Sequence, residues 1–146
     1  MDGNYRFNDE NLTLDSFYAN VDVVCSICNR RASARVDFDR HTARLLCTHC
    51  GYSKELSTKI GKYGSLQMAA HMFFNATLWL QAPFKNDTVY AYNDKHLAYL
   101  ECYIQATLRE HKDRTHFTLL EKLPKFYHEA KNRTALLKII AKLKKK

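Results

Sequence analysis

Several short segments within residues 19–56 alternate apolar and polar residues with a period of two, which is typical of half-buried strands. The polar residues Asp39-Arg40-His41 interrupt this pattern and predict a tight turn. We therefore expect a small antiparallel sheet joined by hairpins, after an N-terminal lead-in at residues 1–18 that shows no clear period. The predicted strands are residues 19–24, 32–38, 42–46 and 52–56.

A more apolar region follows this sheet. Residues 58–70 contain Gly61 and Gly64 and are predicted to form a linker or turn. Residues 69–82 fit either a buried strand or a short helix, because a continuous apolar run has no diagnostic period. We favour a hairpin of residues 77–81 and 88–92, with a polar tip at residues 83–87 and Trp79 in the core.

The next segment has the spacing of an amphipathic helix. Asn93 is a suitable N-cap, and Asp94 suits the first turn. Tyr99 and Tyr103 lie on a second face, so the helix is predicted to be covered on two sides. The apolar stripe consists of Leu97, Leu100, Ile104 and Leu108.

Two more helical segments are predicted near the C-terminus. Leu119, Leu120 and Leu123 indicate a short turn or helix that stops before Pro124, which can itself open a segment over residues 125–131. The last helix is expected to begin near Asn132. One face of it carries Leu136, Ile139, Ile140 and Leu143, and the opposite face carries Lys138, Lys142 and Lys145.

The charge of the chain is unevenly distributed. The 146 residues include 23 Lys and Arg against 15 Asp and Glu, a net charge of +8. Residues 131–146 carry seven basic side chains and no acid, so nearly all the excess lies in the last helix. The basic face is either a solvated surface or an electrostatic contact to nucleic acid or an acidic partner. Binding to a membrane surface is a weaker option, since the apolar stripe lacks Trp or Phe.

Four of the five cysteines form two tight pairs, Cys25-Ser26-Ile27-Cys28 and Cys47-Thr48-His49-Cys50. This spacing is typical of a structural zinc site, because two residues between thiolates let one turn aim both sulfurs at a metal. Gly51 follows the second pair and suits a position with positive φ. With the predicted strands, the pairs indicate a four-cysteine zinc ribbon over residues 19–57 that holds one structural zinc ion.

Other roles for these residues are less favoured. Two disulfides are disfavoured by the odd number of cysteines and by the absence of an apparent signal peptide. A redox pair would need a thioredoxin-like context. His49 is expected to be a neighbour of the site, since four thiolates complete a tetrahedron. Cys102 is expected to be a buried or half-buried packing residue.

The chain shows none of the common enzymatic motifs. It has no phosphate-binding glycine loop, no H-E-x-x-H and no G-x-S-x-G. No apolar run reaches the ~18 residues of a membrane-spanning helix. We therefore expect a cytoplasmic protein that is not an enzyme and has no small-molecule substrate. The oligomeric state is not indicated.

Parts of the chain resemble known proteins. The two cysteine knuckles, with Gly51-Tyr52, look like those of zinc ribbons in transcription and replication proteins. Most of residues 20–146 is similar to a family of bacterial zinc-ribbon-containing proteins of unassigned function, so the resemblance implies a fold rather than an activity. That family carries cysteines after the Trp-bearing strand, where this chain has Pro83-Phe84-Lys85-Asn86. The matching segments are Leu78-Trp79-Leu80-Gln81, Ala91-Tyr92-Asn93, His96-Leu97, Tyr99-Leu100-Glu101, Leu123-Pro124-Lys125 and Ala130-Lys131-Asn132-Arg133.

The predicted fold is α+β: a zinc ribbon at residues 19–57, a linker at 58–70, and at 71–146 a hairpin with three or so helices, the last basic and amphipathic. Two functions remain open. The first is nucleic-acid binding without strong sequence preference, through Arg30, Arg31, Arg35, Arg44, Lys142, Lys144, Lys145 and Lys146. The second is a protein-interaction module, such as an adaptor or a toxin-neutralising partner, with aromatic anchors among Tyr90, Tyr92, Tyr99 and Tyr103.

Overall fold

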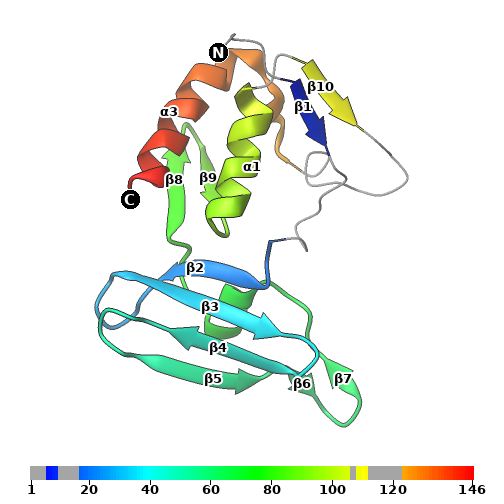
Figure 1. Cartoon of the computed structure of the whole chain (residues 1–146), viewed down its shortest axis with the longest axis vertical. Helices are drawn as coiled ribbons and strands as arrows, with labels where there is room; N and C mark the ends of the chain where they lie inside the picture. Colours follow the sequence, from blue (N-terminus) through cyan, green and yellow to red (C-terminus); the bar gives the residue numbers. More distant parts are fainter. Residues whose placement is uncertain (1–5, 10–16, 106–107, 112–122) are drawn as a thin grey trace. The chain divides into compact units, whose positions relative to one another are not determined.

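The computed structural model describes residues 6–9, 17–105, 108–111 and 123–146, with residues 6–9 and 108–111 as backbone alone (Figure 1). The chain divides into two compact units. The ribbon unit, Phe17–Leu80, is one continuous segment, whereas the helical unit combines Met1–Ser16 with Gln81–Lys146. The cysteine pairs and the candidate arginines therefore belong to the ribbon unit, and the C-terminal lysines belong to the helical unit.

The ribbon unit contains a four-stranded antiparallel sheet in the order β2-β3-β4-β5. Each strand begins and ends within one residue of a predicted strand, so the predicted sheet is confirmed. Alternate side chains, among them Val21, Ala34 and Leu45, are buried on one face of the sheet. The strands are β2 (Asn20–Val24), β3 (Arg31–Asp37), β4 (Thr42–Leu46) and β5 (Ser53–Ser57).

A short 3-10 helix, η2 (Ala70–Phe74), packs against β2, β3 and β4. Beyond it, Leu78 pairs with Val23 in an isolated antiparallel bridge, so the chain returns along the edge of β2. The apolar run at residues 69–82 is thus part helix and part extended chain. The sheet meets this segment with small buried side chains that permit a close approach, including Ala32, Ala34 and Ala43.

Residues 58–70 contain a small hairpin, which projects from one end of the sheet (Figure 1). Its strands are β6 (Lys59–Ile60) and β7 (Gly64–Ser65), joined by Gly61-Lys62-Tyr63. Gly61 has a φ of 60°, which side chains disfavour. A Cβ on Gly64 would lie 2.9 Å from the carbonyl oxygen of Ile60. The two glycines that predicted a turn therefore serve different purposes, one conformational and one steric.

In its described residues, the helical unit combines a β-hairpin with two α-helices and two 3-10 turns. Helices α1 (Asp94–Gln105) and α3 (Arg133–Lys144) pack against each other. Their fully buried side chains include Leu97, Leu100, Leu136 and Ile140. The other elements are β1 (Arg6–Asp9), which pairs in parallel with β10 (Leu108–His111), the hairpin β8 (Leu80–Phe84) and β9 (Asp87–Ala91), η3 (Lys125–His128) and η4 (Ala130–Asn132).

The predicted hairpin exists, but its predicted register is wrong. Strands β8 and β9 are separated only by Lys85-Asn86, whereas the sequence suggested a tip of five residues. Pro83 lies inside β8, which is allowed because a two-stranded sheet leaves one side of each strand unpaired. The first strand of the hairpin begins at Leu80, three residues later than predicted. Leu80 is buried and Trp79 is half-buried, so the predicted core position of Trp79 is also wrong.

The described residues contain fewer helices than the sequence suggested for the whole chain. The described residues contain two α-helices, where three or so were predicted. The segment after Pro124 forms η3 and η4 instead, because the backbone of Glu129 between them is extended. Leu119 and Leu120 lie outside the described residues. The last helix is present as predicted, and no helix in the described ranges is long and apolar enough to cross a membrane.

The C-terminus of α1 and the N-terminal cap of α3 differ from the prediction, whereas the N-terminal cap of α1 agrees with it. Helix α1 ends at Gln105, so Leu108 belongs to strand β10 and not to the apolar stripe. At the start of α1 the cap is confirmed, because the side chain of Asn93 accepts a hydrogen bond from the His96 amide at 2.9 Å. Asn132 precedes α3 but makes no capping bond; its amide group instead donates to the Phe126 carbonyl and accepts from Lys85.

Candidate metal centre

The two cysteine pairs lie at the same end of the ribbon sheet. Cys25 and Cys28 follow β2, and Cys47 and Cys50 follow β4. Strands β2 and β4 run in the same direction on either side of β3, so the turns that follow them lie at the same end of the sheet. The connectivity of two hairpins therefore brings together two cysteine pairs that have 18 residues between them in the sequence.

The four sulfur atoms lie within 4.8 Å of one another. The Sγ atoms of Cys25 and Cys50 are 3.7 Å apart, and those of Cys28 and Cys47 are 3.6 Å apart. A tetrahedron with metal–sulfur bonds of about 2.3 Å has sulfur–sulfur edges of about 3.8 Å. The four cysteines can therefore hold one metal ion, and the predicted cluster is present.

The two turns have the same backbone design. The Asn29 amide donates to the Cys25 carbonyl and the Gly51 amide donates to the Cys47 carbonyl, both at 2.9 Å. Asn29 has a φ of 62° and Gly51 a φ of 81°. The expected positive φ at Gly51 is confirmed. Asn29 holds the equivalent place after the first pair, and its tolerance of this conformation is a sequence signal that we missed.

Backbone amides directed at the sulfurs favour the thiolate form of two cysteines. The Cys28 amide, helped by the Ile27 amide at 3.4 Å from the sulfur, lowers the pKa of Cys25 to about 7. The Cys50 amide, together with the His49 amide, lowers the pKa of Cys47. Although the Arg30 and Tyr52 amides act in the opposite direction, burial and hydrogen bonds between the sulfurs raise the pKa of Cys28, and raise that of Cys50 to about 12. Metal binding requires thiolates, so an ion would displace protons from these two cysteines.

The remaining cysteine does not take part. The five thiols are all free, and the sulfur distances within the cluster are far longer than a disulfide bond of about 2 Å. Cys102 is exposed on α1, so its predicted packing role is wrong. His49 is exposed in the second turn, which is consistent with a neighbour of the cluster and not a ligand.

Three of the candidate arginines share the solvent face of the sheet. Arg35 and Arg44 stand directly opposite each other on β3 and β4, and both are exposed. Neither has a hydrogen bond or ion pair within the residues that the structure describes. Arg31 on β3 is bound to the Asp22 carboxylate of β2. Arg30 precedes β3 and is exposed beside the first cysteine turn.

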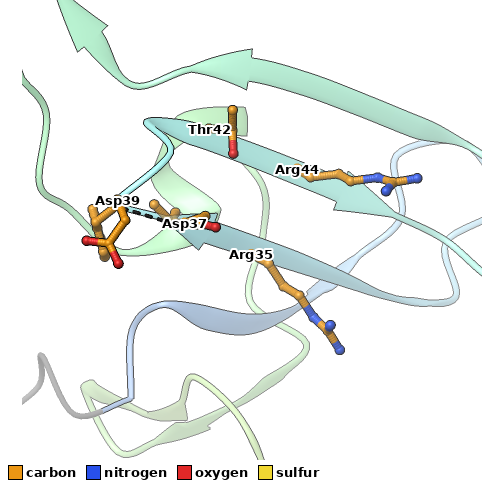
Figure 2. A pocket seen from close by; sticks show the side chains of 7 residues that line it. Arg35, Asp37, Asp39, Thr42 and Arg44 are labelled. Carbon is orange, nitrogen blue, oxygen red and sulfur yellow. Dashed lines mark hydrogen bonds between the residues drawn. The ribbon is translucent and has the colours of Figure 1, made fainter.

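An open groove follows the arginine pair along the sheet. Figure 2 shows the side chains of Arg35 and Arg44 extending away from Asp37 and Asp39 at the other end of the groove. The Asp37 carboxylate accepts the Asp39 and Arg40 amides at 3.1 Å each, so it stabilises the β3–β4 turn. The groove is lined by Arg35, Val36, Asp37, Phe38, Asp39, Thr42 and Arg44.

The C-terminal lysines belong to the helical unit and are exposed. Lys144 forms an ion pair with Glu101 of α1 at 2.8 Å, so its charge is already partly compensated. Lys142, Lys145 and Lys146 lie in or just after the last turn of α3.

The aromatic anchors proposed for a protein partner are mostly unsuitable. Tyr92, Tyr99 and Tyr103 are buried, and Tyr90 is half-buried. Burial of Tyr99 and Tyr103 confirms that α1 is covered on a second face. The exposed aromatic that the sequence pattern did not single out is Tyr63, in the turn of the β6–β7 hairpin.

Comparison with protein families, with curated proteins and with solved structures finds no match to this chain. The resemblance to a bacterial zinc-ribbon family therefore stays a prediction, and the four-cysteine cluster of a zinc-ribbon-like motif is what the structure establishes.

Proposed function

We propose that this is a non-enzymatic zinc-ribbon protein that binds nucleic acid through the solvent face of the ribbon sheet, without strong sequence preference. The observation that carries the proposal is the pair Arg35 and Arg44, which stand side by side on an exposed sheet face with no partner in the described residues. A guanidinium binds phosphate oxygens through two parallel hydrogen bonds, so two of them on one face suit a phosphate backbone.

Zinc is the ion that best fits the cluster. Four thiolates at tetrahedral spacing match its preferred structural coordination. Because the four sulfurs occupy every tetrahedral position, no position remains for water or a substrate. The ion would stabilise the two turns and the ends of the four strands, and thereby the face on which the arginines lie.

The ion pairs of the described residues favour some of the candidate basic residues over others as phosphate contacts. The ribbon unit carries eight basic and four acidic side chains, a balance of +4 before any metal is counted. Arg31 and Lys144 are already engaged by Asp22 and Glu101, so they offer less to a ligand than the unpaired arginines. We therefore assign the main phosphate contacts to Arg35 and Arg44, with Arg30 and the C-terminal lysines as secondary contacts.

Titration of the zinc-loaded full chain with labelled DNA and RNA tests the proposal by fluorescence anisotropy. Affinity should fall steeply between about 50 and 200 mM salt and differ little among sequences. The variant Arg35→Gln/Arg44→Gln should weaken binding to all sequences alike and reduce the salt slope by about 0.7–0.9 per lost phosphate contact.

Lys54→Gln is the matched control for this variant. Lys54 is exposed on the same sheet, but it is opposite Leu45 in register and so belongs to the other face. Its replacement should change the salt slope much less than loss of an arginine. No detectable binding of DNA or RNA at about 50 mM salt would refute nucleic-acid binding. A protein partner retained after nuclease treatment would then favour the adaptor alternative.

A further inference from the structure

The β6–β7 hairpin presents an aromatic ring to solvent on a fixed support. Tyr63 is 91% exposed, the largest value among the exposed large hydrophobic side chains of the described residues. It lies in the three-residue turn between Ile60 and Gly64. Because the ring is exposed, it adds little apolar burial to the fold and is accessible to a ligand.

The base of the hairpin is anchored to the β3–β4 turn. The Thr58 amide donates to the His41 carbonyl at 2.9 Å, and the Leu66 amide donates to the Thr58 carbonyl at 2.8 Å. The Ser65 hydroxyl contacts both the Thr58 hydroxyl, at 3.1 Å, and Nδ1 of His41, at 3.3 Å. Thr58 itself is 1% exposed. The ring is therefore held at the same end of the sheet as the groove lined by Asp37 and Thr42.

The charge of the hairpin favours an anionic ligand. Residues 58–68 contain Lys59 and Lys62 and no acidic residue. The ammonium group of Lys62 lies 5.7 Å from the centroid of the Tyr63 ring. Because Lys62 lies over one face of the ring, a base would stack on the other face, with its phosphate near the lysines of the hairpin.

We infer that Tyr63 is a stacking platform for an unpaired base, so that the ribbon unit prefers single-stranded nucleic acid to duplex. This inference rests on the proposed nucleic-acid binding and specifies its ligand. Bases in a duplex are stacked on each other and cannot reach a ring at a hairpin tip, whereas unpaired bases stack on aromatic side chains.

A protein partner fits the hairpin less well. The exposed large apolar side chains of the hairpin region are Ile60, Tyr63 and Leu66. A stable protein interface uses about 20–30 residues on each side. One ring with adjacent lysines is sufficient for one base, because stacking on a single aromatic side chain already contributes measurably to affinity.

The test measures binding of the zinc-loaded full chain to a labelled single strand of about 12 nucleotides and to the matching duplex. Tyr63→Ala should weaken single-strand binding at least about fivefold and leave duplex binding within about twofold. Its salt slope should be unchanged, because no charge is lost. Tyr63→Phe should retain the affinity. Met72→Ala is the control, since Met72 is 55% exposed in the same unit but outside the hairpin.

The outcomes separate this inference from the proposed function. If the wild type binds neither form, the proposed function fails. If Arg35→Gln/Arg44→Gln weakens binding but Tyr63→Ala does not, the stacking platform alone is wrong. Equal losses on single strand and duplex would also overturn it. A protein captured from nuclease-treated lysate in a Tyr63-dependent manner, without any nucleic-acid binding, would assign the hairpin to a protein partner instead.

Discussion

His96 should make the stability of the helical unit depend on pH. This residue is 1% exposed, near the start of α1. Its Nδ1 accepts a hydrogen bond from the Tyr92 amide at 3.0 Å, so the ring is neutral and carries its proton on Nε2. The rings of Tyr90 and Tyr92 lie 6.3 and 5.2 Å from it. Burial in these surroundings lowers the pKa of His96 to about 4.

The sign and size of the effect follow from the two pKa values of His96. The unfolded chain takes up a proton near pH 6.5, but the folded chain does so only near pH 4. Between these values the unfolded state binds more protons, so the free energy of unfolding falls as the pH falls. The contribution of neutral His96 to the free energy of unfolding is complete above about pH 6.5. About 3 kcal/mol of this contribution is lost by pH 4. Between pH 7.5 and 5 the loss is about 2 kcal/mol.

Urea unfolding followed by far-ultraviolet circular dichroism measures this loss, because α1 and α3 both lie in the helical unit. The matched variant is His96→Asn, whose side-chain oxygen can accept the Tyr92 amide but does not titrate. Both proteins contain the same metal centre. Subtracting the free energy of unfolding of the variant from that of the wild type at each pH therefore removes the contribution of the metal centre. The reasoning fails if His96→Asn shows the wild-type pH dependence, or if NMR finds the His96 pKa at 6.5 or above.

Three further predictions concern other parts of the chain. Metal analysis should find one zinc ion per chain, and a chelator should unfold the ribbon sheet, seen as loss of amide-exchange protection in β2–β5. Gly64→Ala should lower the melting temperature and disorder the hairpin, because its Cβ would lie 2.9 Å from the Ile60 carbonyl oxygen, while the exposed Gln67→Ala should not. A double-mutant cycle on Lys144 and Glu101 should give a coupling of at most about 1 kcal/mol that decreases with salt, since both side chains are partly exposed.

The ribbon could be predicted from the sequence because its signals are local. A period of two identifies each strand, and the spacing within each cysteine pair defines a turn. The opposition of Arg35 and Arg44 was not predicted. The expected turn at residues 39–41 is centred on residue 40 and would place Val36 opposite Arg44, whereas the observed register pairs Arg35 with Arg44.

The helical unit was less predictable because its arrangement depends on distant contacts. Strands β1 and β10 pair in parallel although they lie about a hundred residues apart, and neither short segment has a distinctive period. The same limit applies to the end of the ribbon unit, where the apolar run at residues 69–82 has no period that separates the helix η2 from the extended chain after it. Asn132 has the residue type of a cap, yet tertiary contacts with Phe126 and Lys85 use its side chain instead.

The arginine pair is the feature of the ribbon unit that folding alone explains least. Like charges directly opposite each other destabilise an antiparallel pair of strands. Charges that serve the fold have partners here, as Arg31 has in Asp22 and Lys144 has in Glu101. Arg35 and Arg44 have none in the described residues, although Glu55 stands opposite Arg44 on the next strand. A local conflict on an open face is typical of a binding site, and an anionic ligand between the two guanidinium groups would remove the repulsion.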